Sequence, residues 1–128
     1  MLKTLVFGAS TKSERYAYKA ITRLRAAGHP VVAIAKRAGK VADVDFLIGE
    51  PALEDIHTIT LYVSPRYIAP HIDYLISLKP KRIIFNPGTE NPEFVEKAKA
   101  AGILTIEACT LVMLSIGVYE DMEADGVH

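Results

Sequence analysis

Short apolar runs alternate with amphipathic stretches along almost the whole chain. The runs are nearly continuous in Val, Ile, Leu, Phe and Thr rather than alternating with charged residues, and they fall at residues 3–7, 31–35, 58–63, 82–85 and 103–107. Runs of this kind are typical of strands that are buried on both faces of a parallel sheet. The pattern therefore predicts five main strands. A weaker run at residues 46–48 predicts a short extra strand.

The stretches between these runs predict helices. Residues 17–27 carry small or apolar side chains at helical spacing, and Gly28 follows where a helix-ending residue belongs. Ser64 and Pro65 predict the start of a second helix, which Pro70 makes irregular before residue 72. Asn91 predicts the N-cap of a third helix. The apolar stretch at residues 111–116 predicts a short helix.

Strands that alternate with helices predict an α/β fold. We expect a single doubly wound, parallel, five-stranded sheet of Rossmann-like type in residues 1–119, followed by a polar tail at residues 120–128. Such sheets bind ligands at the carboxyl ends of their strands. That rule would bring together the loops at residues 8–15 (the first loop), 36–40 (the basic loop), 63–67, 86–89 and 108–110.

Charge and composition limit the kinds of molecule that the protein is expected to bind. The chain of 128 residues has 15 basic and 15 acidic residues, which gives no general attraction to nucleic acid or to an anionic membrane. The sequence has no signal peptide pattern and no apolar stretch long enough to span a bilayer. The single Cys109 excludes an internal disulfide. We therefore expect a cytoplasmic protein.

The first loop predicts an anion site. A strand that ends on Gly8 and leads into a helix directs backbone N–H groups and the helix dipole towards a bound phosphate. Hydroxyl and cationic side chains in the same loop would add contacts. The predicted ligand contacts in this loop are Gly8, Ala9, Ser10, Lys12 and Arg15. A purely structural turn remains the alternative, and Thr11 with Glu14 also fits a capping box.

The end of the second strand distinguishes among nucleotides. NAD-binding domains place an acidic residue there for the ribose 2′-hydroxyl, whereas this chain has Lys36 and Arg37. Two cations would attract a phosphorylated ribose, which favours NADP or coenzyme A over NAD. A solvated basic loop is the alternative.

The sequence shows no catalytic set. The four histidines are scattered without metal-ligand spacing, and no nucleophile-elbow motif is present. Cys109 follows the fifth strand and is expected to lie at the predicted ligand edge, with a buried and inert thiol as the alternative.

The loops resemble a known family, the small stand-alone CoA-binding proteins, which consist of the domain also found at the N-terminus of the succinyl-CoA synthetase α subunit. The similar segments occur in the family's order over residues 3–117, and they are Gly8-Ala9-Ser10-x-Lys12-x-x-Arg15-x-x-Tyr18, Val63-Ser64-Pro65, Asn86-Pro87-Gly88-Thr89 and Ala101-Gly102-Ile103…Cys109.

The resemblance implies a role for each loop. The first loop and the basic loop would hold the 3′-phospho-ADP part of CoA, and the third- and fourth-strand turns would line the path of the pantetheine arm, with Cys109 near the CoA thiol. The implied contacts in the later loops are Lys36, Arg37, Val63, Ser64, Pro65, Asn86, Pro87, Gly88 and Cys109. The second domain of the synthetase, with its phosphorylated histidine, has no counterpart here, so its ligase activity does not carry over.

These observations lead to one expected function and two alternatives. We expect a protein that binds coenzyme A or an acyl-CoA without catalysis of its own. The alternatives are an NADP-dependent reductase and an interaction module that binds no ligand and forms a homodimer through residues 111–116.

Overall fold

The protein folds around one seven-stranded sheet. The computed structural model describes residues 1–122. The strands are β1 (Thr4–Phe7), β2 (Val31–Ile34), β3 (Lys40–Val41), β4 (Val44–Leu47), β5 (Thr58–Leu61), β6 (Arg82–Phe85) and β7 (Leu104–Glu107). The predicted α/β class is confirmed, and the predicted count of five strands is wrong because a hairpin adds to one edge.

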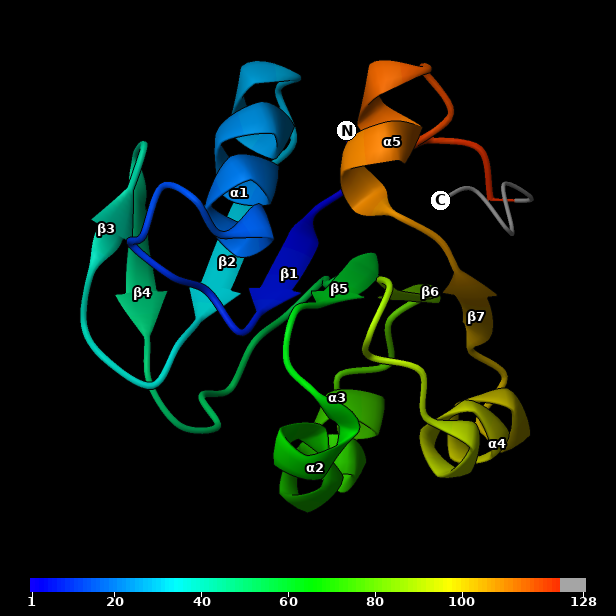
Figure 1. Ribbon diagram of the computed structural model, residues 1–128. Coiled ribbons are helices and arrows are strands. Elements are labelled where there is room, and N and C mark those ends of the chain that lie inside the picture. Colours follow the sequence, from blue (N-terminus) through cyan, green and yellow to red (C-terminus); the bar gives the residue numbers. More distant parts are fainter. Residues whose placement is uncertain (123–128) are drawn as a thin grey trace.

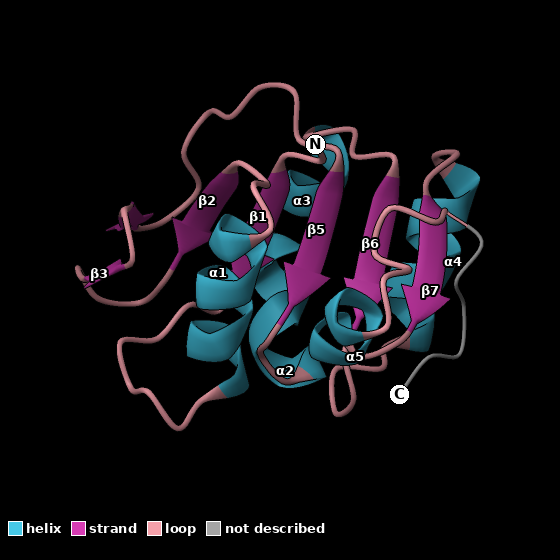
Figure 2. Ribbon diagram, turned by 90° about the horizontal axis from the view of Figure 1, so that it is seen from above, coloured by secondary structure: helices cyan, strands magenta, loops and turns pink. Residues whose placement is uncertain are grey.

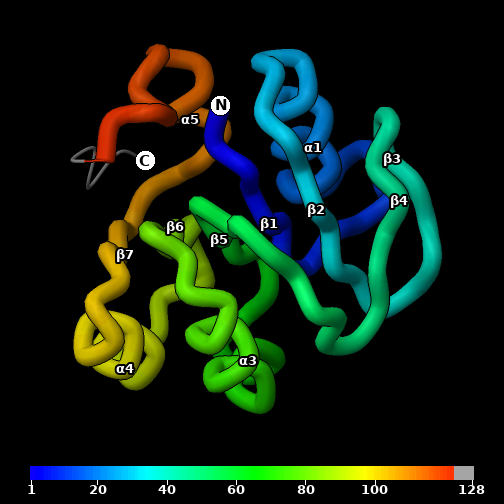
Figure 3. Tube along the Cα trace, turned by 180° about the vertical axis from the view of Figure 1, so that it is seen from behind, coloured from blue at the N-terminus to red at the C-terminus, as the bar shows by residue number. Residues whose placement is uncertain are grey.

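The strand order is that of a doubly wound sheet. The order across the sheet is β3-β4-β2-β1-β5-β6-β7, and every pair is parallel except β3 with β4. From β1 the chain moves outwards to β2 and β4, then returns to the other side of β1 to form β5, β6 and β7 (Figure 3). Successive strands are added on one side of β1 up to β4 and on the other side from β5 onwards. Open α/β sheets form a ligand crevice at the place where this order changes, which here lies between β1 and β5.

The hairpin of β3 and β4 replaces part of the predicted basic loop. Lys40 pairs with Asp45 and Val41 pairs with Val44, so only Ala42 and Asp43 form the turn. Ala42 adopts a φ of 54°, in the left-handed region that two-residue hairpin turns require. The weak run at residues 46–48 does form a strand, but β4 begins earlier, at Val44.

Helices cover both faces of the sheet. They are α1 (Tyr16–Ala26), α2 (Pro65–Ile68), the 3₁₀ turn η1 (Ala69–His71), α3 (Ile72–Ser77), α4 (Pro92–Ala100) and α5 (Thr110–Ser115). Figure 1 shows α1 and α5 side by side on one face and α2, α3 and α4 on the other. Seen from above in Figure 2, the parallel strands end at a common edge. The irregular helix start around Pro70 is confirmed by η1, and Asn91 caps α4 by accepting a hydrogen bond from the Phe94 N–H.

Each face of the sheet has its own apolar core. On the α1 and α5 face, Leu24 and Met113 are fully buried with Val6 of β1. On the opposite face, Phe85 and Phe94 pack edge to face with ring centroids 5.3 Å apart. The stretch at residues 111–116 contributes Leu111 and Met113 to the buried side chains, so much of its apolar surface is already covered within the chain. The tail predicted at residues 120–128 lies mostly outside the described residues.

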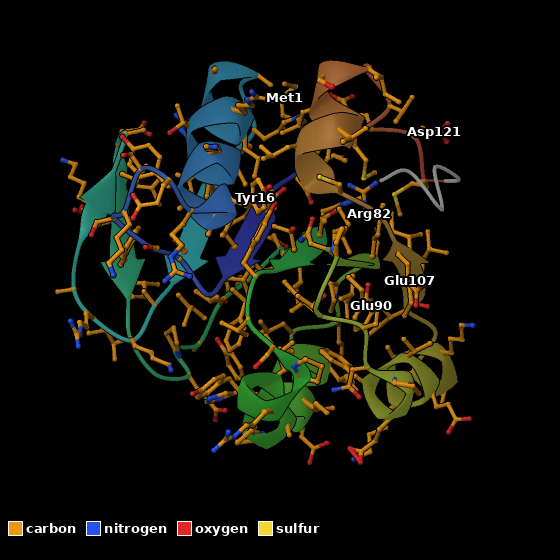
Figure 4. All side chains as sticks on the ribbon, viewed as in Figure 1. Met1, Tyr16, Arg82, Glu90, Glu107 and Asp121 are labelled. Atoms are coloured by element: carbon orange, nitrogen blue, oxygen red, sulfur yellow. The ribbon has the colours of Figure 1, made fainter. Side chains whose placement is uncertain are left out.

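A buried arginine lies beneath α5. Arg82, which is labelled in Figure 4, is completely buried. Its Nε donates to Thr58 Oγ1, and its Nη1 donates to the backbone carbonyl of Tyr119. The guanidinium carbon lies 4.7 Å from the centre of the Tyr119 ring, and burial lowers the Arg82 pKa from its usual value. Since Tyr119 is also buried, these contacts hold residues 118–121 against the sheet.

Candidate functional site

One large cleft opens at the carboxyl ends of the parallel strands. Its volume is about 940 Å³, near the upper end of the range for small-molecule sites. Its walls come from the loops after β1, β2, β5, β6 and β7 and from the first turns of α1 and α5. The five predicted loops, far apart in the sequence, therefore do meet at one place.

The cleft contains nearly every residue that the sequence singled out. The predicted residues that line it are Gly8, Ala9, Ser10, Lys12, Arg15, Lys36, Arg37, Val63, Ser64, Asn86, Pro87, Gly88 and Cys109. Pro65 is absent from the lining because it is the first residue of α2, on the side of the sheet away from α1. The lining residues that were not predicted as ligand contacts are Thr11, Tyr16, Ala17, Ala35, Ala38, Phe46, Tyr62, Thr89, Leu111 and Val112. The only sequence feature that could have predicted them is their position next to the ends of strands and helices.

The first loop does not present all the donors that its pattern predicted. The N–H groups of both Gly8 and Ala9 donate to the Ile34 carbonyl, each at 3.0 Å, so they tie the loop to β2 and are not free for a ligand. The predicted capping box is also wrong, because α1 begins only at Tyr16 and its N-cap is Arg15.

The late start of α1 leaves a second candidate anion site. No side chain of residues 1–122 caps this helix, so the N–H groups of its first turn have no side-chain partner in that part of the chain. Tyr16 stands at this end of the helix (Figure 4), and Arg15 and Tyr16 both line the cleft. The helix end thus turns uncapped donors and the positive end of its dipole towards the cleft.

Gly8 is required by a neighbouring strand. Its φ is +100°, and a Cβ built on it would lie 2.5 Å from Val63 Cγ1 and 3.1 Å from the Tyr62 carbonyl carbon. The glycine therefore lets the end of β1 pass close to the end of β5. The close approach that Gly8 permits is therefore between two segments of the protein.

The cleft is rich in cations without acidic partners. Lys12, Arg15, Lys36 and Arg37 line it, and none of them forms a salt bridge with a carboxylate of residues 1–122. Elsewhere Arg25 is paired with Asp43 at 2.8 Å. The unpaired cations give the cleft a positive potential that favours an anionic ligand.

Asn86 supports the cleft from below. Its Nδ2 donates to Thr60 Oγ1 at 2.6 Å and to the Leu61 carbonyl at 2.8 Å, while its Oδ1 accepts from the Thr110 N–H at 2.9 Å. These bonds join β5, β6 and the start of α5. The Asn86 side chain is therefore engaged within the protein, and its part in the site is to hold the loops that a ligand would contact.

The end of the cleft at β7 is less polar. Cys109 is partly exposed there and precedes α5 as its N-cap residue. Leu111 and Val112 continue this wall, and Tyr62 lies nearby with a pKa that burial raises far above its usual value. The phenol of Tyr62 is therefore neutral at physiological pH.

Among residues 1–122, no acid–base pair of carboxylate or histidine side chains lines the cleft. Within the described residues, no histidine, aspartate or glutamate lines it, and no group of three or more His, Cys, Asp or Glu side chains could hold a metal ion. None of the described helices has the length and apolar character needed to cross a membrane.

Comparisons with known proteins agree with this geometry. The sequence profile of the family described as "CoA binding domain" matches residues 3–115. A crystal structure of an uncharacterized protein is 43% identical, with a TM-score of 0.89 over 92% of this chain and 98% of that one. No curated protein matches the sequence.

Two more distant structures share the fold. A hypothetical protein from Pyrococcus horikoshii OT3 is 24% identical, with a TM-score of 0.76 over 84% of this chain and 78% of that one. A protein from Thermus thermophilus is 19% identical, with a TM-score of 0.81 over 91% of this chain and 90% of that one.

Proposed function

We propose that this chain, which belongs to the CoA-binding domain family, binds coenzyme A or an acyl-CoA in the cleft and catalyses no reaction by itself. The observation that carries the proposal is the group of unpaired cations. Lys12, Arg15, Lys36 and Arg37 meet at the ends of β1 and β2 without carboxylate partners among the described residues. A ligand with several phosphates would supply the missing negative charge.

The arrangement of the strands suggests how the ligand lies. The cleft runs from the end of β2 to the end of β7, across four strand spacings of roughly 4.8 Å each, or about 19 Å. The cations occupy the β2 and β1 end, whereas Pro87, Gly88 and Cys109 occupy the β6 and β7 end. We place the 3′-phospho-ADP at the cationic end and the pantetheine arm along the less charged end.

The lining chemistry supports binding without catalysis. General acid–base catalysis needs a group that exchanges protons near neutral pH within reach of the substrate. The described lining offers lysines, arginines, a cysteine and two tyrosines, but no carboxylate or imidazole. Of the two tyrosines, Tyr16 is exposed, and burial strongly raises the pKa of Tyr62. An NADP-dependent reductase would use the same cations, so a direct comparison of the two ligands is needed to separate these functions.

Removing the 3′-phosphate should weaken binding. We expect CoA to bind roughly tenfold or more tightly than 3′-dephospho-CoA, because a charge-assisted contact contributes about 1.5–3 kcal/mol. The double variant Lys36→Ala with Arg37→Ala should lose most of that preference while keeping its affinity for 3′-dephospho-CoA. Isothermal titration calorimetry with CoA, 3′-dephospho-CoA, NADP and NAD measures all four affinities.

Two outcomes of this titration would contradict the proposal. Equal affinity for CoA and 3′-dephospho-CoA would place Lys36 and Arg37 outside the site. Tighter binding of NADP than of CoA would favour the reductase alternative.

The position of Cys109 gives a second test of ligand orientation. With CoA disulfide, the Cys109 thiolate should attack one sulfur, form a protein–CoA disulfide, break the S–S bond of the reagent and release one CoA thiolate. Intact-protein mass spectrometry should detect one added CoA, formed faster than the glutathione adduct from equal oxidised glutathione. A folded protein that stays unmodified but reacts after denaturation would show that the pantetheine end lies elsewhere.

A further inference from the structure

The Lys36 ammonium lies on the face of an aromatic ring. Its Nζ is 3.8 Å from the centre of the Tyr67 ring, close enough for a cation–π contact. Lys36 closely follows β2, and Tyr67 lies in α2, which follows β5. Since β2 and β5 flank β1, the pair joins the loop after β2 to the helix after β5, on opposite sides of the end of β1.

The contact orders a side chain that would otherwise be free. Lys36 is exposed and forms no salt bridge within the described residues, so the Tyr67 ring is what holds it. An ordered lysine loses less rotamer entropy on binding a ligand than a freely moving one. A carboxylate would also hold Lys36, but it would neutralise the charge. The aromatic ring leaves the full charge and the ammonium donors available for a phosphate.

Tyr67 itself does not line the cleft. The lining includes Lys36 but not Tyr67, which is 50% exposed. A second cation, Arg66, lies farther from the ring, with its guanidinium carbon 5.9 Å from the ring centre. The ring is thus placed to act on the site through Lys36 rather than by contact with the ligand.

We propose that Tyr67 is a positioning residue that holds Lys36 for the 3′-phosphate of coenzyme A and so sets the preference of the cleft for the phosphorylated ribose. This inference rests on the proposed function. It assigns a role in ligand discrimination to a residue outside the cleft, and it predicts that the role depends on the aromatic face and not on the phenol hydroxyl.

The test is the ratio of affinities for CoA and 3′-dephospho-CoA, measured by calorimetry in Tyr67→Leu and Tyr67→Phe. Tyr67→Leu should lower the ratio by roughly threefold to tenfold, the cost of ordering one long side chain. Tyr67→Phe should keep the ratio of the unmodified protein. In a Lys36→Ala background, Tyr67→Leu should have no further effect on the ratio, because the side chain that it positions is gone.

The possible outcomes distinguish a failure of the positioning role of Tyr67 from a failure of the proposed CoA binding. An unchanged ratio in Tyr67→Leu would overturn the positioning role, and so would an equal loss of affinity for both ligands, which would mean that the ring contacts the adenine or only supports the fold. If Arg66→Ala lowers the ratio of the two affinities as much as Tyr67→Leu does, the positioning role of Tyr67 is also overturned, because the role would then belong to Arg66. Absence of CoA binding by the unmodified protein would overturn the proposed function first.

Discussion

Replacing Gly8 by alanine is expected to destabilise the fold by about 2–6 kcal/mol. A φ of +100° is strained for any residue with a Cβ, which costs roughly 1–3 kcal/mol. The new methyl group would also lie 2.5 Å from Val63 Cγ1, and overpacking of this kind costs a further ~1–3 kcal/mol. Thermal and urea unfolding followed by circular dichroism measure the loss.

A substitution at a second glycine, Gly102, distinguishes the cost of backbone strain from the cost of steric crowding. Gly102 has a φ of +78°, but a Cβ there would have no neighbouring atom within 4 Å. Gly102→Ala should therefore cost only the backbone strain. Adding Val63→Ala to Gly8→Ala should recover part of the stability, because it removes the nearest crowded atom but leaves the Tyr62 backbone. If Gly8→Ala loses no more stability than Gly102→Ala, the close approach of β1 and β5 is not what requires Gly8.

The centre of the sheet was predictable from the sequence because β1, β5 and β6 are buried on both faces. Such strands need continuous apolar runs, and β1, β5 and β6 lie within the predicted runs. Once the strands and helices alternate, the parallel order brings the loops to one edge. That is why residues as distant as Lys12 and Cys109 could be assigned to one cleft from the sequence alone.

The features that the sequence did not predict depend on contacts between distant segments. The β3–β4 hairpin has only two paired positions, so its apolar pattern is too short to recognise. Nothing near Asn86 in the sequence indicates that its amide bonds to Thr60 and Thr110. The burial of Arg82 follows from Tyr119, which is distant in sequence and meets it only when the chain folds back over the sheet.

Contacts between distant segments also explain why the first loop was wrongly predicted to have free N–H groups at Gly8 and Ala9. The local pattern of strand, glycine and helix is compatible with free N–H groups, and only the position of β2 shows that the Ile34 carbonyl already accepts them. If the proposed function holds, a loop whose backbone is partly occupied would attract phosphate chiefly through its side chains and through the uncapped start of α1. We therefore expect the side chains of Lys12 and Arg15, and not the backbone N–H groups of Gly8 and Ala9, to contribute most of the binding energy in this loop.

Removing both cations of the first loop is therefore expected to have the largest effect on binding. The double variant Lys12→Ala with Arg15→Ala should weaken CoA binding by roughly 2–3 kcal/mol, or about 30- to 150-fold. This loss is smaller than the sum for two fully effective charge-assisted contacts because both side chains are exposed and screened by solvent. The affinity of the unmodified protein should fall as salt is raised, and the variant should show a weaker salt dependence.

The matched control is Lys97→Ala with Lys99→Ala. It makes the same change in net charge on exposed residues of α4, which lies on the opposite face of the sheet from α1 (Figure 1). We expect this control to bind CoA within a factor of about two of the unmodified protein, because charges beyond roughly 10 Å are screened at physiological salt. Equal losses in the two double variants would show that overall charge, and not the first loop, attracts the ligand. A large loss confined to Lys12 and Arg15 would instead place the diphosphate between the first loop and the start of α1.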